Sequence, residues 1–241
     1  MSLPRRLKSV RGVIVDMDGL LVDSEPVYRM ASQRAIAQQG LTLTDAAHQR
    51  LVGLPAREVY RALTDMFEAQ LDLDRYRTDF SPAWQDLVAE GALQAKPGAH
   101  ELLDFLAAAR IPHALATSSY RPHMYGTLGS AGLADRIRHS VCGDEVEISK
   151  PHPEIVHRAA ALISVSAVDC VVLEDSHVGV EAALAAGALP LMVPDQLTAK
   201  AEHLERGAHV VDNLHQVIEH LEAHLPRTAS IRGDSSTNGS A

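Results

Sequence analysis

Cysteine, aromatic residues and long hydrophobic runs are all scarce in this 241-residue chain. Its two cysteines, Cys142 and Cys170, each lie in an apolar segment, which favours buried free thiols over a disulfide framework or a metal site. Free thiols fit a reducing compartment. Residues 1–11 carry basic side chains without the apolar run of a signal peptide, and no segment is long enough to span a membrane. The sequence therefore predicts a cytoplasmic protein with no membrane partner.

Positive charge is also in short supply. The chain has 22 basic and 31 acidic side chains, which give a formal net charge of −9. This balance provides no electrostatic footprint for a polyanion, so nucleic acid is not an expected partner. A small phosphate ester remains a possible substrate if one site gathers hydrogen-bond donors and a divalent cation.

The composition is globular, with 46% hydrophobic and 22% charged residues, and the length allows a large core with a smaller insert. The β-branched run Val13-Ile14-Val15 predicts a buried strand that ends on the carboxylates of Asp16 and Asp18, with a turn at Gly19. From residue 100 onwards, helical stripes alternate with short apolar runs, and the expected strands are 113–117, 140–142, 170–173 and 189–193, with an edge strand at 210–211. This alternation predicts an α/β fold with a parallel, Rossmann-like sheet and helices on both faces.

A different pattern separates the first strand from the others. Residues 24–94 show helical spacing without a convincing alternating strand, and loops are expected near residues 53–55 and at Ser81-Pro82. We therefore expect an α/β core over residues 1–23 and 95–225 and an inserted, all-helical cap over residues 24–94. Residues 226–241 are rich in Ser, Thr, Gly and Asn without apolar periodicity, which predicts a disordered tail.

Polar residues follow several of the expected strands. Because the carboxyl ends of parallel strands share one edge of a sheet, these residues are expected to meet there although they lie far apart in sequence. Taken alone, an Asp-x-Asp-Gly run is equally typical of an acidic turn. Thr117 could instead cap the next helix, and Lys150 could be a solvated turn residue. The residues expected at the edge are Asp16, Asp18, Thr117, Ser118, Lys150, Glu174 and Asp175.

Together, in this order and spacing, these residues resemble the four motifs of the haloacid dehalogenase superfamily, from about residue 12 to about residue 193. The resemblance implies that Asp16 is a nucleophile forming an aspartyl-phosphate and that Asp18 acts as acid and base. Dehalogenating members lack the second acid, so Asp18 indicates phosphoryl transfer. The implied Mg²⁺ ligands are Asp16, the backbone carbonyl of Asp18 and Asp175, with Glu174 either a ligand or a partner behind the ligands.

The remaining implied roles concern the phosphoryl group. Thr117 and Ser118 would bind its oxygens, and Lys150 would stabilise the developing charge. The residue types suit the task. Uncatalysed hydrolysis of phosphate monoesters is slow enough for enzymes to accelerate it by ~10²¹-fold, whereas acid–base help alone gives roughly 10²- to 10⁴-fold. A carboxylate nucleophile and an oxygen-ligated cation are therefore also needed.

The position of the insert resembles the β-phosphoglucomutase-like branch of this superfamily. Tyr28 and Arg57 are expected to face the substrate, whereas Trp84 is expected in the core. The mutase carries a histidine at the position of Tyr28 and an arginine at the position of Ala56, and residues 24–95 contain no lysine, unlike the mutase cap. We therefore predict a Mg²⁺-dependent phosphatase of a small phosphorylated metabolite such as a sugar phosphate. The alternatives are a β-phosphoglucomutase-like phosphomutase and a catalytically silent binding module.

Four histidines are interpreted as structural or surface residues without a role in the site. His220 and His224 have the i, i+4 spacing of a zinc-binding pair, but they lie opposite the apolar stripe of the last helix and lack an evident third ligand. A solvated face is the favoured interpretation. His152 and His177 follow motif residues closely and are interpreted as turn residues.

Overall fold

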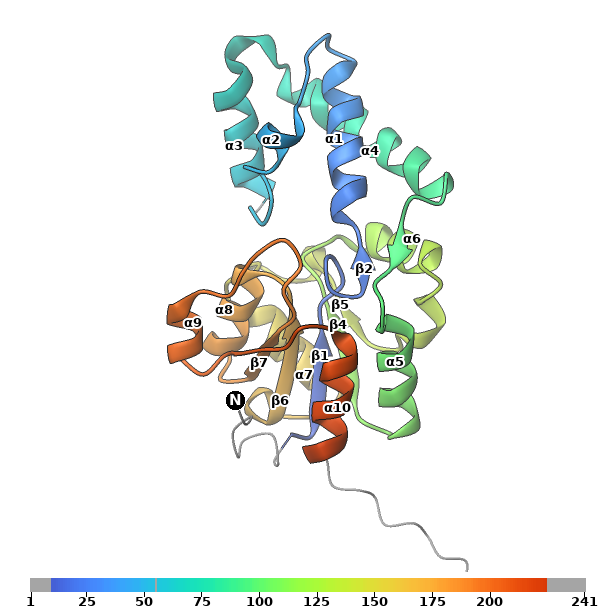
Figure 1. The fold of residues 1–241 in the computed structure, drawn as a ribbon, viewed down its shortest axis with the longest axis vertical. Coiled ribbons are helices and arrows are strands. Elements are labelled where there is room, and N and C mark those ends of the chain that lie inside the picture. The colour runs from blue at the N-terminus through green and yellow to red at the C-terminus, as the bar shows by residue number, and fades with distance from the viewer. Residues whose placement is uncertain (1–9, 55, 225–241) are drawn as a thin grey trace, which may run out of the picture.

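The computed structural model describes residues 10–54 and 56–224, so the predicted tail at 226–241 and the first nine residues lie outside the described residues. Its centre is a six-stranded sheet in the order β5-β4-β1-β6-β7-β8, with every neighbouring pair parallel (Figure 1). The predicted α/β fold class is confirmed. The strands are β1 (Gly12–Val15), β4 (His113–Ala116), β5 (Ser140–Val141), β6 (Cys170–Glu174), β7 (Leu189–Met192) and β8 (His209–Val210).

Strand β1 is buried on both faces. Because successive side chains of a strand point to opposite sides, its residues enter two different cores. Val13 and Val15 belong to one hydrophobic core and Ile14 to another. The first core contains side chains of α5 (Ala99–Ala108), α6 (Arg121–Ser130) and α10 (Leu214–His224), and the second contains those of α7 (Glu154–Leu162) and α8 (His177–Ala185). Helices therefore cover both faces of the sheet, as the sequence predicts.

An insert of helices stands beyond the carboxyl ends of the strands (Figure 1). It comprises α1 (Glu25–Ala37), α2 (Asp45–His48), α3 (Ala56–Phe67) and α4 (Leu73–Ala89), and α1 packs along α4. The insert has its own buried cluster, which includes Ile36, Leu63 and Tyr76. The helical cap is therefore confirmed as part of the fold, whereas its division from the core at residues 24 and 94 stays a prediction.

Two local features differ from the sequence predictions. Val22–Asp23 (β2) and Gln94–Ala95 (β3) form a small antiparallel ribbon where the chain enters and leaves the insert. Strands of two residues are too short to produce a periodic pattern. The loop expected at Ser81-Pro82 is wrong, because α4 continues through both residues. Burial of Trp84 and Leu87 on the face of α4 that packs inward favours a continuous helix despite the hydrogen bond lost at proline.

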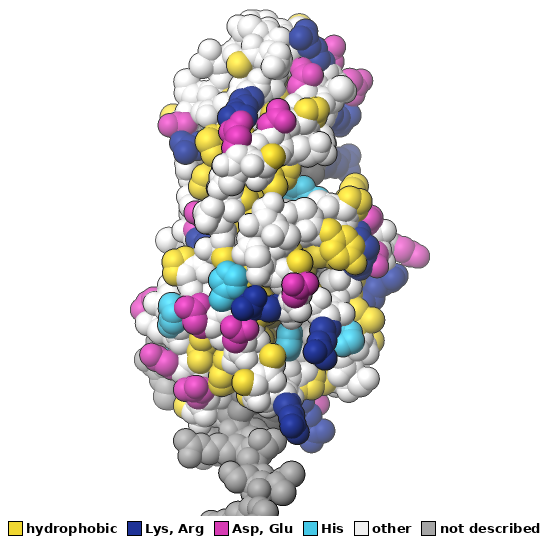
Figure 2. All heavy atoms as spheres, turned by 90° about the vertical axis from the view of Figure 1, so that its right-hand side faces the viewer, with side chains coloured by type: hydrophobic (Ala, Val, Ile, Leu, Met, Phe, Trp, Pro, Cys, Tyr) yellow, Lys and Arg dark blue, Asp and Glu magenta, His cyan; other side chains and the backbone are white. Residues whose placement is uncertain are grey.

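The remaining elements are short. Helix α9 (Ala201–Glu205) lies between β7 and β8 in the chain, and 3-10 helices cover Glu68–Gln70, Ala134–Arg136, Gly143–Glu145 and Ala167–Asp169. Both cysteines are free and buried, as predicted. None of the helices within the described ranges combines the length and the apolar character needed to cross a bilayer. On the face in Figure 2, acidic and basic side chains lie interspersed.

Candidate active site

The expected edge exists at the carboxyl ends of β1, β4 and β6. Register pairs Val15 with both Leu115 and Leu173, so that the residues following these strands start from the same level. The backbone N–H of Asp16 donates to the carbonyl of Leu173 at 3.1 Å, which ties the first acid to the neighbouring strand. We call Asp16, Asp18, Thr117, Lys150, Glu174 and Asp175 the strand-end site.

Lys150 joins the acids of this site directly. Its Nζ donates to Asp16 Oδ1 at 2.6 Å, to Glu174 Oε1 at 2.6 Å and to the carbonyl of Ala116 at 2.9 Å. All three ammonium hydrogens are thus used. Burial opposes the charged form of the lysine, but the two carboxylates outweigh burial and raise the pKa of Lys150 above its ordinary value. Lys150 is therefore a buried ammonium ion and not a solvated turn residue.

The carboxylates are crowded. Burial raises the pKa of Asp175 well above its ordinary value, and Asp16 and Glu174 raise it further. Burial also raises the pKa of Asp16, with Lys150 opposing it and the charges of Glu174 and Asp18 adding to it. One lysine does not offset this many acids in a water-poor site, so additional positive charge would stabilise their ionised forms.

The donor set fits a hard divalent cation. Asp16, Glu174 and Asp175 each offer a carboxylate oxygen, and these oxygens lie within 4.8 Å of one another. Oxygen ligands of this kind suit Mg²⁺. Gly19 makes room for the Asp175 carboxylate: the φ of Gly19 is +78°, and a Cβ there would lie 2.1 Å from Asp175 Oδ2. The glycine that follows the two aspartates is thus needed both for the turn and for the acid opposite.

Glu174 is held by several groups at once. One of its oxygens accepts from Lys150, and the other accepts from Ser176 Oγ at 2.9 Å. A Cβ on Gly179 would lie 1.9 Å from this carboxylate, so the start of α8 passes close beside it. Both oxygens already have protein donors, which favours a partner behind the ligands over a direct ligand, the two roles that the sequence leaves open.

The hydroxyl residues after β4 have separate contacts. Thr117 is buried, and its Oγ1 accepts from the backbone N–H of Ser119 at 3.0 Å. The N-cap of α6 is Tyr120, so Thr117 forms a turn at the strand end and does not cap the helix. Ser118 is exposed, and its backbone carbonyl faces Gly143, where a Cβ would lie 2.2 Å from the oxygen.

Asp18 is tethered on one side only. Its Oδ2 accepts from Ser119 Oγ at 2.8 Å, whereas its Oδ1 is buried without a hydrogen-bond partner among the described residues. Ser119 has no role in the sequence prediction, although it continues the hydroxyl run that begins at Thr117. A fixed carboxyl group with one open oxygen is suited to exchanging a proton with a bound molecule.

The two residues predicted to reach the site from the insert lie in different surroundings. Tyr28, on α1, has its hydroxyl 3.2 Å from Nε2 of His123 on α6. Arg57 is exposed in the first turn of α3, and no hydrogen bond or ion pair of the described residues joins it to the strand-end site. His123 lies inside a helix with no motif around it, so its sequence context does not indicate a role for it.

Two further histidines named in the sequence contact backbone carbonyls, and His177, which the sequence indicates as a turn residue, is instead the first residue of α8. His177 Nε2 lies 2.7 Å from the carbonyl of Thr198, and the His224 ring contacts the carbonyl of His220 at 2.8 Å. Within residues 10–54 and 56–224, the acids described above are the one group of metal-ligand type side chains that converges, and His220 and His224 do not form another.

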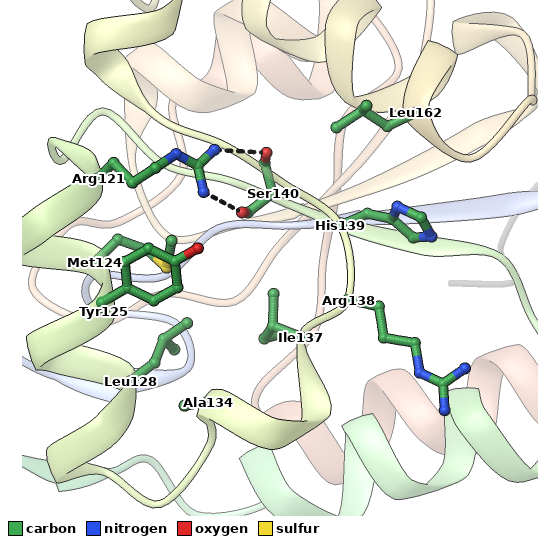
Figure 3. A pocket seen from close by; sticks show the side chains of 10 residues that line it. All are labelled: Arg121, Met124, Tyr125, Leu128, Ala134, Ile137, Arg138, His139, Ser140 and Leu162. Carbon is green, nitrogen blue, oxygen red and sulfur yellow. Dashed lines mark hydrogen bonds between the residues drawn. The ribbon is translucent and has the colours of Figure 1, made fainter.

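A separate hollow of about 240 Å³ lies beside α6 and the edge strand β5 (Figure 3). Arg121 reaches across it and donates to Ser140 Oγ at 3.0 Å and to the Ser140 carbonyl at 3.1 Å. Tyr125 and Leu162 contribute apolar walls. None of the residues of the strand-end site lines this hollow, so it is distinct from the acid cluster.

Comparisons with known proteins agree with this geometry. The sequence profile of the haloacid dehalogenase-like hydrolases matches residues 13–193. A phosphorylated carbohydrates phosphatase from Thermotoga maritima is 35% identical over 178 residues, which are 74% of this chain and 82% of the relative.

Two solved structures extend the likeness to the insert. One from Thermotoga maritima, provisionally assigned as a β-phosphoglucomutase, has a TM-score of 0.76 and 32% identity, and the match covers 89% of this chain and 99% of that one. A HAD family hydrolase from Deinococcus radiodurans with bound phosphate and sodium has a TM-score of 0.70 and 29% identity, with coverage of 87% and 94%. The matched region therefore includes both the sheet and the insert.

Proposed function

The chain belongs to the haloacid dehalogenase-like hydrolase family and is a phosphoric monoester hydrolase, and we propose that it acts through an aspartyl-phosphate formed at Asp16. The observation that carries the proposal is the direct contact of the buried Lys150 ammonium with Asp16, within a group of converging acids. This arrangement sets a carboxylate nucleophile beside fixed positive charge, which a phosphoryl transfer needs.

The first step transfers the phosphoryl group to the protein. A carboxylate oxygen of Asp16 attacks phosphorus, the bond from phosphorus to the ester oxygen breaks, and the carboxyl group of Asp18 gives its proton to that leaving oxygen. The products are the free alcohol and the aspartyl-phosphate. The open Oδ1 of Asp18 supports this role, because the other oxygen is already held by Ser119.

The second step releases phosphate. Asp18, now a carboxylate, takes a proton from a water molecule whose oxygen attacks phosphorus, and the bond between phosphorus and the Asp16 oxygen breaks. Lys150 would offset the charge that returns to Asp16, and the Thr117 and Ser118 segment would hold phosphoryl oxygens. Mg²⁺ held by Asp16, Asp175 and the backbone carbonyl of Asp18, with Glu174 behind them, would supply charge neutralisation at the phosphoryl group.

We infer that the substrate is a small phosphorylated metabolite, for which the phosphatase from Thermotoga maritima suggests sugar phosphates. The structural likeness to a provisional β-phosphoglucomutase keeps a phosphomutase as the second candidate. Incubation with glucose 1-phosphate and its bisphosphate activator separates the two, because a phosphatase releases inorganic phosphate and a mutase yields glucose 6-phosphate.

Turnover of p-nitrophenyl phosphate and of a panel of phosphorylated metabolites with Mg²⁺ tests the proposal. We expect Asp16→Asn to lower kcat by roughly 10⁴- to 10⁶-fold, because the amide is not a nucleophile for phosphorus. Mass spectrometry of acid-quenched wild-type enzyme should locate the phosphoryl group on Asp16. Unchanged turnover by Asp16→Asn would contradict the mechanism, and the absence of turnover in the wild type would favour a catalytically silent binding module.

A further inference from the structure

Three rings from three helices meet between the insert and the core. The ring centroids of Tyr28 on α1 and Trp84 on α4 are 4.4 Å apart, and those of Trp84 and His123 on α6 are 4.6 Å apart. The Tyr28 hydroxyl lies 3.2 Å from His123 Nε2, which closes the triangle. Figure 1 shows α6 beneath the end of α4, so the core supplies one ring and the insert supplies the other two.

This cluster is linked along the chain to Asp18 of the strand-end site. Ser119, whose hydroxyl holds Asp18, is four residues before His123 and immediately precedes Tyr120, the N-cap of α6. Burial raises the pKa of Tyr28, and the negative charge of Asp18 raises it further. Burial lowers the pKa of His123, and the charge of Asp18 opposes that effect. Because Ser119 holds Asp18 and His123 lies in the first turn of α6, the three rings lie at the end of α6 that is nearest to Asp18.

We propose that His123 is a positioning residue for the acid–base step, fixing the Tyr28 hydroxyl on the leaving-group side of Asp18. The proposal rests on the proposed phosphatase function and adds a residue to it. His123 acts through Tyr28, to which it is hydrogen-bonded, and has no contact of its own with Asp18. Trp84 supports the back of both rings, which limits the directions in which the tyrosine can turn.

A packing role alone would not require this arrangement. Packing on Trp84 needs a flat ring, which phenylalanine would provide equally well, whereas the contact with Tyr28 uses a ring nitrogen. Because burial keeps the tyrosine a phenol and favours a neutral imidazole, one group donates the hydrogen and the other accepts it. The hydroxyl is thus oriented by a partner from the core while its own helix belongs to the insert.

Orientation on this side matters most for poor leaving groups. A basic leaving oxygen needs the proton of Asp18 as the phosphorus bond breaks, whereas a stable phenolate leaves without much help. If the Tyr28 hydroxyl holds the leaving oxygen against the open Oδ1 of Asp18, loss of His123 should slow esters with basic leaving groups selectively. A residue that merely fills space would affect all esters of one size equally.

The test compares two aryl esters of similar size, phenyl phosphate and p-nitrophenyl phosphate, whose leaving groups differ strongly in basicity. We expect His123→Phe to lower kcat for phenyl phosphate roughly tenfold more than kcat for p-nitrophenyl phosphate. In a Tyr28→Phe background, the His123→Phe substitution should lower kcat no further, because His123 acts through the Tyr28 hydroxyl that this background lacks. His123→Gln, which keeps a polar group, should retain most of the wild-type ratio between the two esters.

Tyr76→Phe is the matched control. It removes a buried tyrosine hydroxyl of the insert, which lies 3.1 Å from Ser32 Oγ and, among the described residues, has no hydrogen bond to the strand-end acids. The ratio between the two esters should therefore not change. Equal losses on both esters, or additive losses in the double variant, would overturn the positioning role while leaving the phosphatase intact. Should His123→Phe fail to fold, His123→Leu, which also removes the ring nitrogen, carries the same comparison. Failure of the proposed function is distinguishable, because wild-type enzyme would then turn over neither ester.

Discussion

The strand-end site and the helical insert manage charge in opposite ways. In the site, the side chains of Lys150, Asp16 and Glu174 are 4%, 9% and 1% exposed, and Lys150 contacts each of the two acids at 2.6 Å. In the insert, the pair Arg34–Glu90 is 44% and 56% exposed. A buried charge that loses its partner is strongly destabilising, whereas exposed pairs contribute little. The core therefore keeps buried charges that the chemistry uses, whereas the stability of the insert depends on apolar and aromatic packing.

Replacing Lys150 should break this comparison most severely. Lys150→Met leaves the carboxylates of Asp16 and Glu174 buried without their cation, and we expect a loss of about 3–5 kcal/mol in the free energy of unfolding. Denaturant titration without and with Mg²⁺ measures the loss and the part that the metal restores. Lys200→Met is the matched control, since Lys200 is half exposed and 3.9 Å from Glu202, and it should change stability little. Equal losses in the two variants would refute the contrast.

A methyl group beside Glu174 should give the next largest effect. Gly179→Ala forces the carboxylate away from Lys150 and Ser176, because the new Cβ would lie 1.9 Å from it, and we expect a loss of about 1–3 kcal/mol together with reduced kcat. Thermal unfolding and p-nitrophenyl phosphate turnover check both.

Gly126→Ala is the control for this substitution. Gly126 is exposed within α6, and a Cβ there would meet nothing within 4 Å, so alanine should be neutral or stabilise by up to about 1 kcal/mol. If both glycine variants lose activity to the same extent, the close approach of α8 to Glu174 is not important.

Glu25, a half-buried acid at the base of the insert, allows a pH test. Burial raises the pKa of Glu25 from 4.5 to about 7, with Asp195 adding to the shift, Arg29 opposing it and Asp23 adding again. Because the folded pKa lies above the unfolded value, the stabilisation is complete below about pH 4.5 and is lost as pH rises through 7. In the wild type, we expect the free energy of unfolding to fall by on the order of 2 kcal/mol between these two pH values. Glu25→Gln should remove this fall.

Denaturant titrations of the wild type and Glu25→Gln across this range measure the decline as a difference, in which all other titrations cancel. Glu58→Gln serves as the control, since Glu58 is exposed on α3. A wild-type decline that survives in Glu25→Gln would assign it to another group.

Removal of an exposed ion pair should have the smallest effect. Arg34 donates to both carboxylate oxygens of Glu90, at 3.2 and 3.0 Å, but both side chains are solvated. We expect Arg34→Gln to leave the free energy of unfolding, measured by denaturant titration, and kcat essentially unchanged. A clear loss of stability would mean that the insert also depends on its charges.

Sequence patterns were sufficient where chemistry imposes a residue type at a strand end. Asp16 and Thr117 follow short apolar strands and Glu174 ends one, and parallel pairing brings these positions together. Lys150 comes from a turn before α7 and joins them through its side chain. Pattern does not reveal partners that depend on side-chain direction. His123 lies in a helix without a motif, and its contact with Tyr28 arises only when α6 and the insert are placed in space.

Local propensity also misleads where packing decides. Ser81-Pro82 has the composition of a loop, yet the helix continues there because its inward face is buried. The ribbon of Val22–Asp23 and Gln94–Ala95 has no signal of its own, since two residues cannot establish an alternation. The fold class is therefore accessible from periodicity, whereas the connections between the insert and the core require coordinates.

That ribbon has a consequence for how such chains diversify. Its strands pair side by side, so the chain enters and leaves the insert at points about one strand spacing, roughly 4.8 Å, apart. A replacement insert would need closely spaced ends, and it would also need side chains in the places of Val27, Ala31 and Trp84, which share one buried cluster with residues of the core helices. Exchange of the insert is therefore limited by its packing on the core as well as by the ribbon.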